Sequence, residues 1–178
     1  MKKNNSKKIY IVLTHTYSIV SKIIKSITKE KYSHISISLD KKCNNMYSFG
    51  RKYRYFALYG VFKKEDLKNG IFKNKNSLIS IYELSISKEK YDNIVNKIKT
   101  IEKENKGYNI IGLLLAKFKV KLHRKKYYCS EFVYEVLSSD DVGILNKEVI
   151  LFKPEEIVNN INCKKIYEGK IRDFIKNL

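Results

Sequence analysis

Residues 33–40 read SHISISLD, a stretch in which polar and apolar side chains alternate without a break. A strand with this pattern presents His34, Ser36 and Ser38 on one face. Its other face carries Ile35, Ile37 and Leu39. The polar group KKCNN that follows predicts a hairpin turn, and residues 45–49 predict the returning strand. We therefore expect an antiparallel hairpin that starts at His34.

Other segments predict further strands and helices on both sides of this hairpin. Strands are expected at 8–13 (KIYIVL), 77–84 (SLISIYEL) and 164–167, and helices at 17–28, 88–105, 109–122, 154–160 and through YYCSEFVYEVLSS at 127–139. Ser87 is the expected N-cap of the helix at 88–105. Residues 50–76 are irregular, aromatic and basic, which predicts short elements or a cover over a site. No linker or repeat divides the chain, so we expect one α+β domain over residues 1–178.

The composition excludes several classes of protein. A hydrophobic content of 43% in 178 residues is enough for a core, which excludes a wholly disordered chain. Seven Gly and one Pro exclude a collagen-like chain. Three Cys with no CxxC spacing argue against a disulfide scaffold and a zinc site, and we expect no metal and no cofactor.

The charge of the chain has two interpretations. The 37 Lys and Arg against 18 Asp and Glu give +19, which is typical of proteins that bind nucleic acid or anionic membranes. However, only four of the 37 are Arg, and the excess of Lys, Asn, Ile and Tyr also fits A/T-rich codon usage. No acid lies between Asp40 and Glu65 or within residues 117–126, so an anionic partner would be sought there. Nucleic acid is a possible partner that the sequence does not favour.

Targeting signals are weak. Basic residues at the N-terminus precede an uncharged run at 9–21, as in a secretory signal peptide. However, this run contains polar residues and no small-residue cleavage site. The uncharged run GYNIIGLLLA at 107–116 is far shorter than the ~20 residues that span a bilayer. We expect a cytoplasmic protein without a transmembrane segment.

Cys129 is the strongest candidate for a nucleophile. It lies at the expected start of an amphipathic helix, where the helix dipole and the free backbone N–H groups favour a thiolate. The same N–H groups can stabilise an oxyanion. A buried structural cysteine is the alternative interpretation of Cys129 taken alone.

His34 is the candidate base. Ser36 and Ser38, its neighbours on the strand face, are small enough for a helix to pack closely, and we expect the helix that bears Cys129 to do so. A strand-end histidine that is solvated or bonded to backbone is the alternative.

These segments together resemble a known family. An opening strand and helix, the SHISISLD strand, the YSFGRK strand (47–52) and the YYCSEFVYEVL helix (127–137) are similar to the circularly permuted NlpC-like cysteine peptidases of papain-like fold, specifically the YiiX-like group. In that family the histidine strand precedes the cysteine helix, and the resemblance covers roughly residues 8–140. It implies a thiol-dependent hydrolase with a central antiparallel sheet packed against the cysteine helix.

The resemblance also implies roles for individual residues. Cys129 would be the nucleophile and His34 the general base. A polar residue on the next strand orients the histidine. Many YiiX-like members have Glu there, whereas this chain has Ser48, whose neutral hydroxyl stabilises an imidazolium less than a carboxylate does. Asp40 shares the face of His34 but lies about 20 Å along the strand, so we expect it not to orient the ring.

Three further residues are weaker candidates for the cleft. His15 could line it or be a solvated loop histidine. Glu131 lies in the first turn of the cysteine helix, where its negative charge interacts favourably with the helix dipole. Tyr128 could form a wall of the cleft or pack in the core.

The expected function is cleavage of an amide bond, such as one in a cell-wall peptide, or of an ester or thioester bond, through an acyl-cysteine intermediate. The substrate would be a small molecule, a peptide or a lipid, and the basic runs are compatible with an anionic one. The alternative is a catalytically weak papain-like module that binds anionic lipid or nucleic acid.

Overall fold

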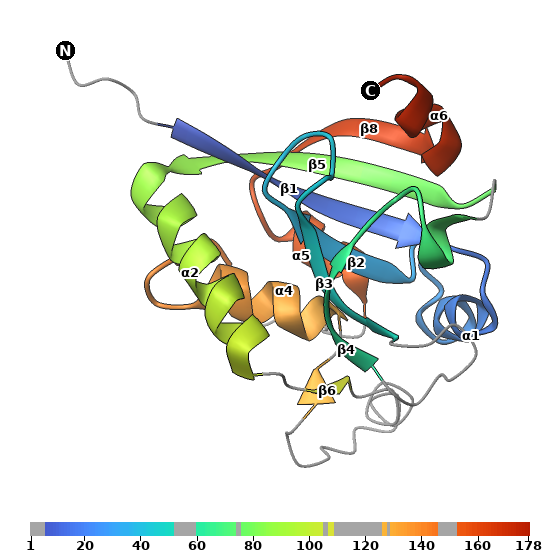
Figure 1. Cartoon of the computed structure of the whole chain (residues 1–178), viewed down its shortest axis with the longest axis horizontal. Helices are drawn as coiled ribbons and strands as arrows, with labels where there is room; N and C mark the ends of the chain where they lie inside the picture. Colours follow the sequence, from blue (N-terminus) through green and yellow to red (C-terminus); the bar gives the residue numbers. More distant parts are fainter. Residues whose placement is uncertain are drawn as a thin grey trace.

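The computed structural model describes residues 6–51, 60–73, 76–104, 107–108, 126–127, 129–145 and 153–178, and these form a twisted sheet with helices on both faces (Figure 1). The expected α+β class is confirmed. In chain order the elements are β1 (Ser6–His15), α1 (Ile19–Thr28), β2 (His34–Ser38), β3 (Met46–Arg51), β4 (Gly60–Glu65), η1 (Gly70–Lys73), β5 (Leu78–Ser87), α2 (Lys88–Glu104), β6 (Gly107–Tyr108), β7 (Lys126–Tyr127), α4 (Cys129–Ser138), α5 (Pro154–Asn159), β8 (Lys164–Lys170) and α6 (Ile171–Lys176).

The sheet has the strand order β7-β6-β4-β3-β2-β1-β5-β8. The six strands from β4 to β8 in this order are antiparallel to their neighbours. The two-residue strands β6 and β7 extend the edge beyond β4 and are parallel to each other. β1 lies inside the sheet between β2 and β5, which explains why Ile9, Ile11 and Leu13 are fully buried.

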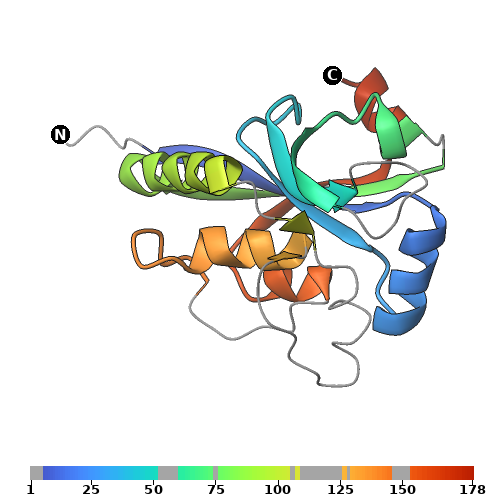
Figure 2. The same ribbon diagram turned by 60° about the horizontal axis from the view of Figure 1, so that its bottom comes forward.

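One face of the sheet is covered by helices α2, α4 and α5. Ile35 and Ile37 of β2 lie in the same hydrophobic cluster as Phe132 and Val133 of α4. Figure 2 shows α4 and α5 on one side of the sheet and α6 on the other. The helix that begins at Cys129 therefore packs on the isoleucine face of β2. Our expectation that it would pack on the serine face was wrong, because the apolar face buries far more hydrophobic area.

The serine face of β2 belongs to a second hydrophobic cluster. Val12 of β1 and Ile81 of β5 lie there together with Phe72 of η1 and Phe174 of α6. Val12 pairs with Ser36 across the β1–β2 ladder, so the two residues share this face. The region around His34 is thus covered by η1.

The segment at 50–76 contains two elements that the sequence did not locate. β4 pairs along β3 from Met46↔Glu65 to Arg51↔Gly60, and η1 follows it. The expectation of short elements in this segment is confirmed. The strands and helices predicted elsewhere in the described residues lie within a few residues of their predicted bounds, and Ser87 Oγ accepts the backbone N–H of Lys90 as the expected N-cap does. The short strands β6 and β7 and the C-terminal helix α6 were not predicted. The helix predicted at 109–122 lies outside the described residues.

An aromatic cluster joins α4 to the sheet. The ring of Phe132 lies 5.7 Å, centroid to centroid, from the rings of both Phe49 and Phe62. Phe132 and Phe49 are fully buried. These contacts determine where the first residue of α4, Cys129, meets the sheet.

Replacing Phe132 by Ala should lower the free energy of unfolding by about 3–5 kcal/mol, because it leaves a cavity between α4 and β3. Urea denaturation followed by circular dichroism measures the change. Glu135→Ala is the matched control on the same helix, since Glu135 makes only a partly exposed ion pair with Lys97 and should cost less than about 1 kcal/mol. A loss below about 1 kcal/mol for Phe132→Ala would contradict the described packing.

Candidate functional site

His34 is the first residue of β2 and lies where the pairing of β2 with β3 has stopped. The ladder between these strands contains Ile37↔Tyr47 and Ser38↔Met46 among the described residues. Continued by one residue, this register places Ser48 opposite Ser36 and diagonal to His34. Ser48 Oγ lies 3.1 Å from His34 Nε2.

A buried carboxylate also reaches His34. Glu65 ends β4 opposite Met46, so its side chain lies on the same sheet face as Ser48. Its two carboxylate oxygens are 3.0 and 3.1 Å from His34 Nε2. Ser36 Oγ donates to the second oxygen at 2.6 Å. Glu65 was not predicted, and it supplies the acidic partner that Ser48 cannot.

Cys129 contacts the same histidine from the start of α4. The charge of Cys129 and hydrogen bonding with it act to raise the pKa of His34, so the two side chains lie near each other, and the Cys129 residue is 6% exposed. α4 lies on the isoleucine face of β2, whereas Glu65 reaches His34 from the serine face. The contact is made beyond the end of the β2–β3 ladder, where side chains from both faces can meet. The structure thus brings together Cys129, His34, Ser48 and Glu65.

The opposite charges of His34 and Glu65 stabilise each other. Burial disfavours the protonated ring of His34, but the charges of Glu65 and Cys129 and their hydrogen bonds outweigh burial and raise its pKa to about 10. Burial likewise acts to raise the pKa of Glu65, but the charge of His34 and hydrogen bonds from His34 and Ser36 leave it below its ordinary value. The pair is therefore an imidazolium–carboxylate ion pair at neutral pH.

The other two cysteines lie in different surroundings. Burial, followed by the charge of Asp40, raises the pKa of Cys43 to about 12. Burial also raises the pKa of Cys163. Neither thiol is favoured as a nucleophile at neutral pH.

Gly50 provides the space through which Glu65 reaches the histidine. A Cβ atom at Gly50 would lie 3.6 Å from Glu65 Oε1 and 3.6 Å from Lys63 Cδ. Both side chains therefore pass over this residue. A side chain larger than a methyl group at position 50 would displace them.

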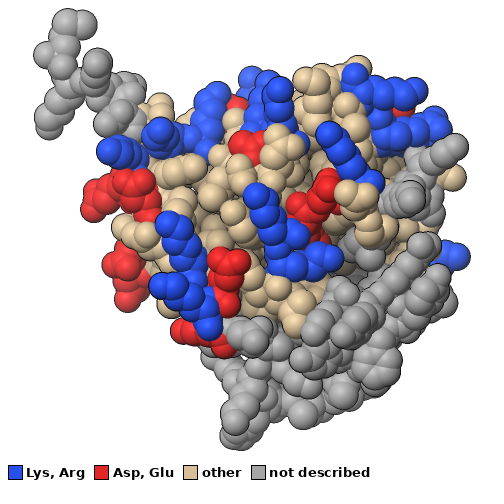
Figure 3. All heavy atoms as spheres, in the orientation of Figure 1, with Lys and Arg blue, Asp and Glu red and all other residues tan. Residues whose placement is uncertain are grey.

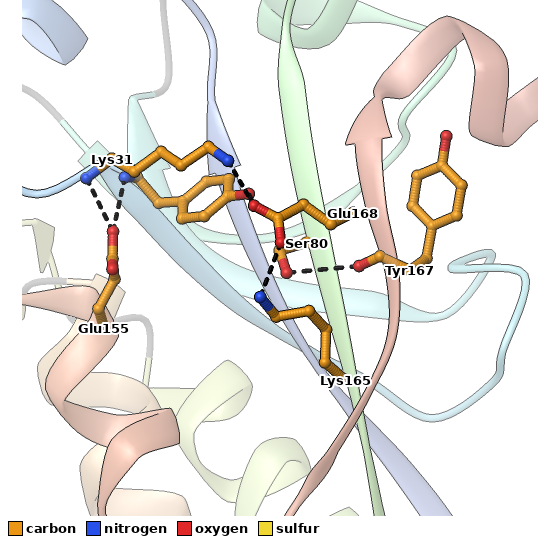
Figure 4. A network of polar contacts seen from close by, with 7 residues as sticks. Lys31, Ser80, Glu155, Lys165, Tyr167 and Glu168 are labelled. Atoms are coloured by element: carbon orange, nitrogen blue, oxygen red, sulfur yellow. Dashed lines mark hydrogen bonds and ion pairs between the residues drawn. The ribbon is translucent and has the colours of Figure 1, made fainter.

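The segment that leads into His34 is held by two carboxylates (Figure 4). Glu155 of α5 accepts the backbone N–H groups of Lys31 and Tyr32 at 2.8 and 3.1 Å. Glu168 of β8 accepts the hydroxyl of Tyr32 at 3.0 Å and the ammonium of Lys31. These bonds fix the entry of the chain into β2.

Glu168 is itself held in place by Lys165, which donates to it at 2.7 Å. Beside them, Ser80 Oγ donates to the backbone carbonyl of Tyr167 at 3.3 Å, which ties β5 to β8 (Figure 4). The anchor of Tyr32 is thus part of the sheet rather than of a free loop.

His15 does not meet the other candidates. It ends β1 and alternates with Thr14, the partner of His34, so it lies on the opposite face of the sheet. Its Nδ1 is 3.0 Å from Ser21 Oγ and 3.2 Å from Ser33 Oγ, and the residue is 2% exposed. The prediction of a solvated loop histidine was wrong, because β1 runs two residues further than its apolar core.

The remaining candidates have separate positions. Glu131 lies in the first turn of α4, as predicted. Tyr128 lies outside the described residues. Asp40 accepts the backbone N–H groups of Lys42 and Asn45 at 3.0 and 2.7 Å, so it closes the hairpin turn and does not orient His34.

Comparisons with known proteins add no assignment. No protein-family model matches the sequence, and no curated protein matches it. Within the described residues, no three His, Cys, Asp or Glu side chains are grouped to hold a metal ion. In the same part of the chain, no helix has the length and apolar character needed to cross a membrane.

The ring of His34 should stay protonated well above the ordinary pKa of 6.5 in the wild-type protein. In Glu65→Gln the largest favourable charge is lost while burial remains, so the pKa of His34 should fall by about 2 or more. The Hε1 resonance, assigned by its absence in His34→Gln, measures both values by NMR.

The direction of the effect on stability follows from the raised pKa. Between pH 6.5 and about 10 the folded state binds a proton that the unfolded state has lost. The contribution of His34 to stability is therefore complete below pH 6.5 and is lost as the pH rises toward 10. A wild-type His34 midpoint near 6.5 would contradict the ion pair.

Proposed function

We propose that the chain is a thiol hydrolase or acyl transferase that cleaves an amide, ester or thioester bond through an acyl intermediate on Cys129. The observation that carries the proposal is that His34 is hydrogen-bonded to Glu65 and has its pKa raised by the neighbouring Cys129. A cysteine paired with a histidine that a third group orients is the arrangement of nucleophilic acyl transfer.

The proposed reaction begins with attack of the Cys129 thiolate on the carbonyl carbon of the substrate. The carbonyl π electrons move to oxygen, and the backbone N–H of Cys129 at the start of α4 stabilises the resulting oxyanion. The intermediate collapses with expulsion of the amine, alcohol or thiol, which takes its proton from the His34 imidazolium. A water molecule or another acceptor then attacks the acyl-cysteine while His34 removes its proton. The thiolate and the imidazolium are restored.

Glu65 is proposed to be the positioning residue for His34. Its carboxylate fixes the ring through Nε2, which leaves the other ring nitrogen for exchange of the proton with Cys129. It also stabilises the positive ring, a role that a serine hydroxyl performs less well. Ser48 and Ser36 complete the hydrogen bonding around Nε2 and Glu65.

The resemblance to the permuted NlpC-like, YiiX-like peptidases supports the same chemistry. The histidine strand precedes the cysteine helix in the chain, as in that family. This chain departs from the family pattern because its acidic residue lies on β4, one strand beyond Ser48. We propose a permuted papain-like fold in which the carboxylate comes from this neighbouring strand, and an acyl substrate drawn from peptides, lipids or small molecules.

A catalytically weak module that binds anionic lipid or nucleic acid is the second proposal, and it has less support. The face seen in Figure 3 shows Lys and Arg scattered, with Asp and Glu among them, rather than gathered in one stripe. Retention on heparin that persists at ~0.5 M salt would favour this alternative. Elution at low salt would leave the hydrolase as the better explanation.

An alkyne-tagged iodoacetamide at low concentration and neutral pH should label the wild-type protein at Cys129. Cys129→Ala should lose about nine tenths or more of the labelling, and His34→Gln should slow it at least about tenfold. Peptide mapping by mass spectrometry measures each site. Cys43→Ser is the control and should label like the wild type. Equal labelling of Cys129→Ala would remove Cys129 as the reactive thiol.

Glu65→Gln should slow labelling of Cys129 by about 10–100-fold, because it removes the charge that supports the imidazolium. Ser48→Ala should slow it by less than about fivefold, since a neutral hydrogen bond is lost. Rates are compared between proteins with equal melting temperatures. A larger effect of Ser48→Ala than of Glu65→Gln would show that the serine orients the histidine.

A further inference from the structure

A small pocket opens beside the candidate catalytic histidine. It has a volume of about 190 Å³ and is lined by Lys63, Lys64, Asp66, Asn69, Gly70 and Phe72. The ring of Phe72 lies 6.4 Å, centroid to centroid, from the ring of His34. Sites for whole small molecules usually measure ~300–1,000 Å³, so this pocket has room for an end group.

Lys63 extends from the pocket toward the catalytic group. It pairs with Ser48 across the β3–β4 ladder and lies two residues before Glu65, so these three side chains share one face. Its Cδ lies over Gly50, at the same 3.6 Å from the position of a Cβ as Glu65 Oε1. The lysine stem therefore runs beside the carboxylate that holds His34.

The positive charge of Lys63 acts on Glu65 and helps to lower the pKa of that carboxylate. Within the described residues the Lys63 ammonium forms no ion pair and no hydrogen bond, whereas Glu65 directs both carboxylate oxygens to His34 and Ser36. Lys63 is half-buried as a residue. A cation that forms no ion pair within the described residues and lies next to the candidate catalytic group favours an anionic group of a ligand.

The other charges of the pocket leave it net positive. Lys64 donates to the neutral side-chain oxygen of Asn45 at 2.8 Å. The Asp66 carboxylate accepts the backbone N–H of Lys68 and the side-chain N–H of Asn69, at 2.8 and 2.7 Å. Asp66 stays negative and is bound within its own turn, so the lining of the pocket is net positive because it holds two lysines and one carboxylate.

We infer that this pocket receives an anionic group of the substrate and that Lys63 is the residue that selects it. The inference rests on the proposed function, and it narrows the substrate to acyl compounds that carry a carboxylate or a phosphate a few bonds from the scissile carbonyl. Phe72, which is almost fully buried, forms the apolar wall of the pocket nearest to His34. The carbonyl then lies between Cys129 and His34, and the anion lies at Lys63.

A matched pair of thiol probes tests the inference. N-bromoacetyl-β-alanine carries a carboxylate, and N-bromoacetyl-β-alanine amide is neutral and has the same number of heavy atoms. The rate constant for alkylation of Cys129 by each probe is measured by mass spectrometry, and their ratio is compared between variants. Lys63→Met keeps the apolar stem and removes the charge, so the ratio of anionic to neutral rates should fall about threefold or more.

Two further variants serve as controls. Lys68→Met removes an exposed charge from the turn after β4 that does not line the pocket, and the ratio should stay at the wild-type value. Lys63→Arg restores a cation and should restore most of the ratio. In wild type the preference for the anionic probe should weaken as salt is raised, because the charge is screened.

The outcomes separate this inference from the proposed function. Normal alkylation of Cys129 with the same ratio in wild type and Lys63→Met would overturn the subsite and leave the thiol chemistry standing. An equal fall in Lys63→Met and Lys68→Met would also overturn it, because the general surface charge would then be the cause. No alkylation of Cys129 by either probe would overturn the proposed function and the subsite together.

Discussion

The site depends on the ion pair between His34 and Glu65, which is held between strands of the same sheet. Moving a carboxylate out of water costs several kcal/mol unless a partner and hydrogen bonds compensate it. Here Ser36 and the histidine supply both. The pair forms only when β2, β3 and β4 are in the described register, because a shift of β4 by one residue turns Glu65 to the other face and brings Lys64 to its place.

The two faces of the sheet perform separate tasks around this pair. The apolar face binds α4 through Phe132 and its aromatic neighbours and so determines where Cys129 lies. The opposite face holds the polar side chains of β2 and β3 beneath η1. The thiol and the carboxylate meet at one imidazole because the β2–β3 ladder ends before His34. The end of the ladder is thus as important for the site as the ladder itself.

Local patterns in the sequence predicted the parts of this arrangement that local physics controls. Alternation in SHISISLD placed His34 and Ser36 on one face, and the family resemblance indicated Ser48 on the next strand, whose hydroxyl lies 3.1 Å from the histidine. The rise of a strand per residue correctly excluded Asp40 as the residue that orients the ring of His34. Glu65 was not predicted, because the strand GVFKKE carries three consecutive charged residues and lacks an alternating apolar pattern. The sheet face on which α4 packs depends on contacts between residues distant in sequence. The hydrophobic pattern of each segment gives no information on these contacts.

The order of the segments along the chain has a consequence for biosynthesis. His34 and Glu65 belong to neighbouring strands, whereas Cys129 joins them from a helix made much later. During translation, His34 and Glu65 are therefore synthesised before Cys129. Contacts of such high sequence separation form late in folding, because a long loop must close first. A nascent or partly folded chain therefore lacks the assembled thiol–imidazole pair, so the candidate site exists only once the fold is complete.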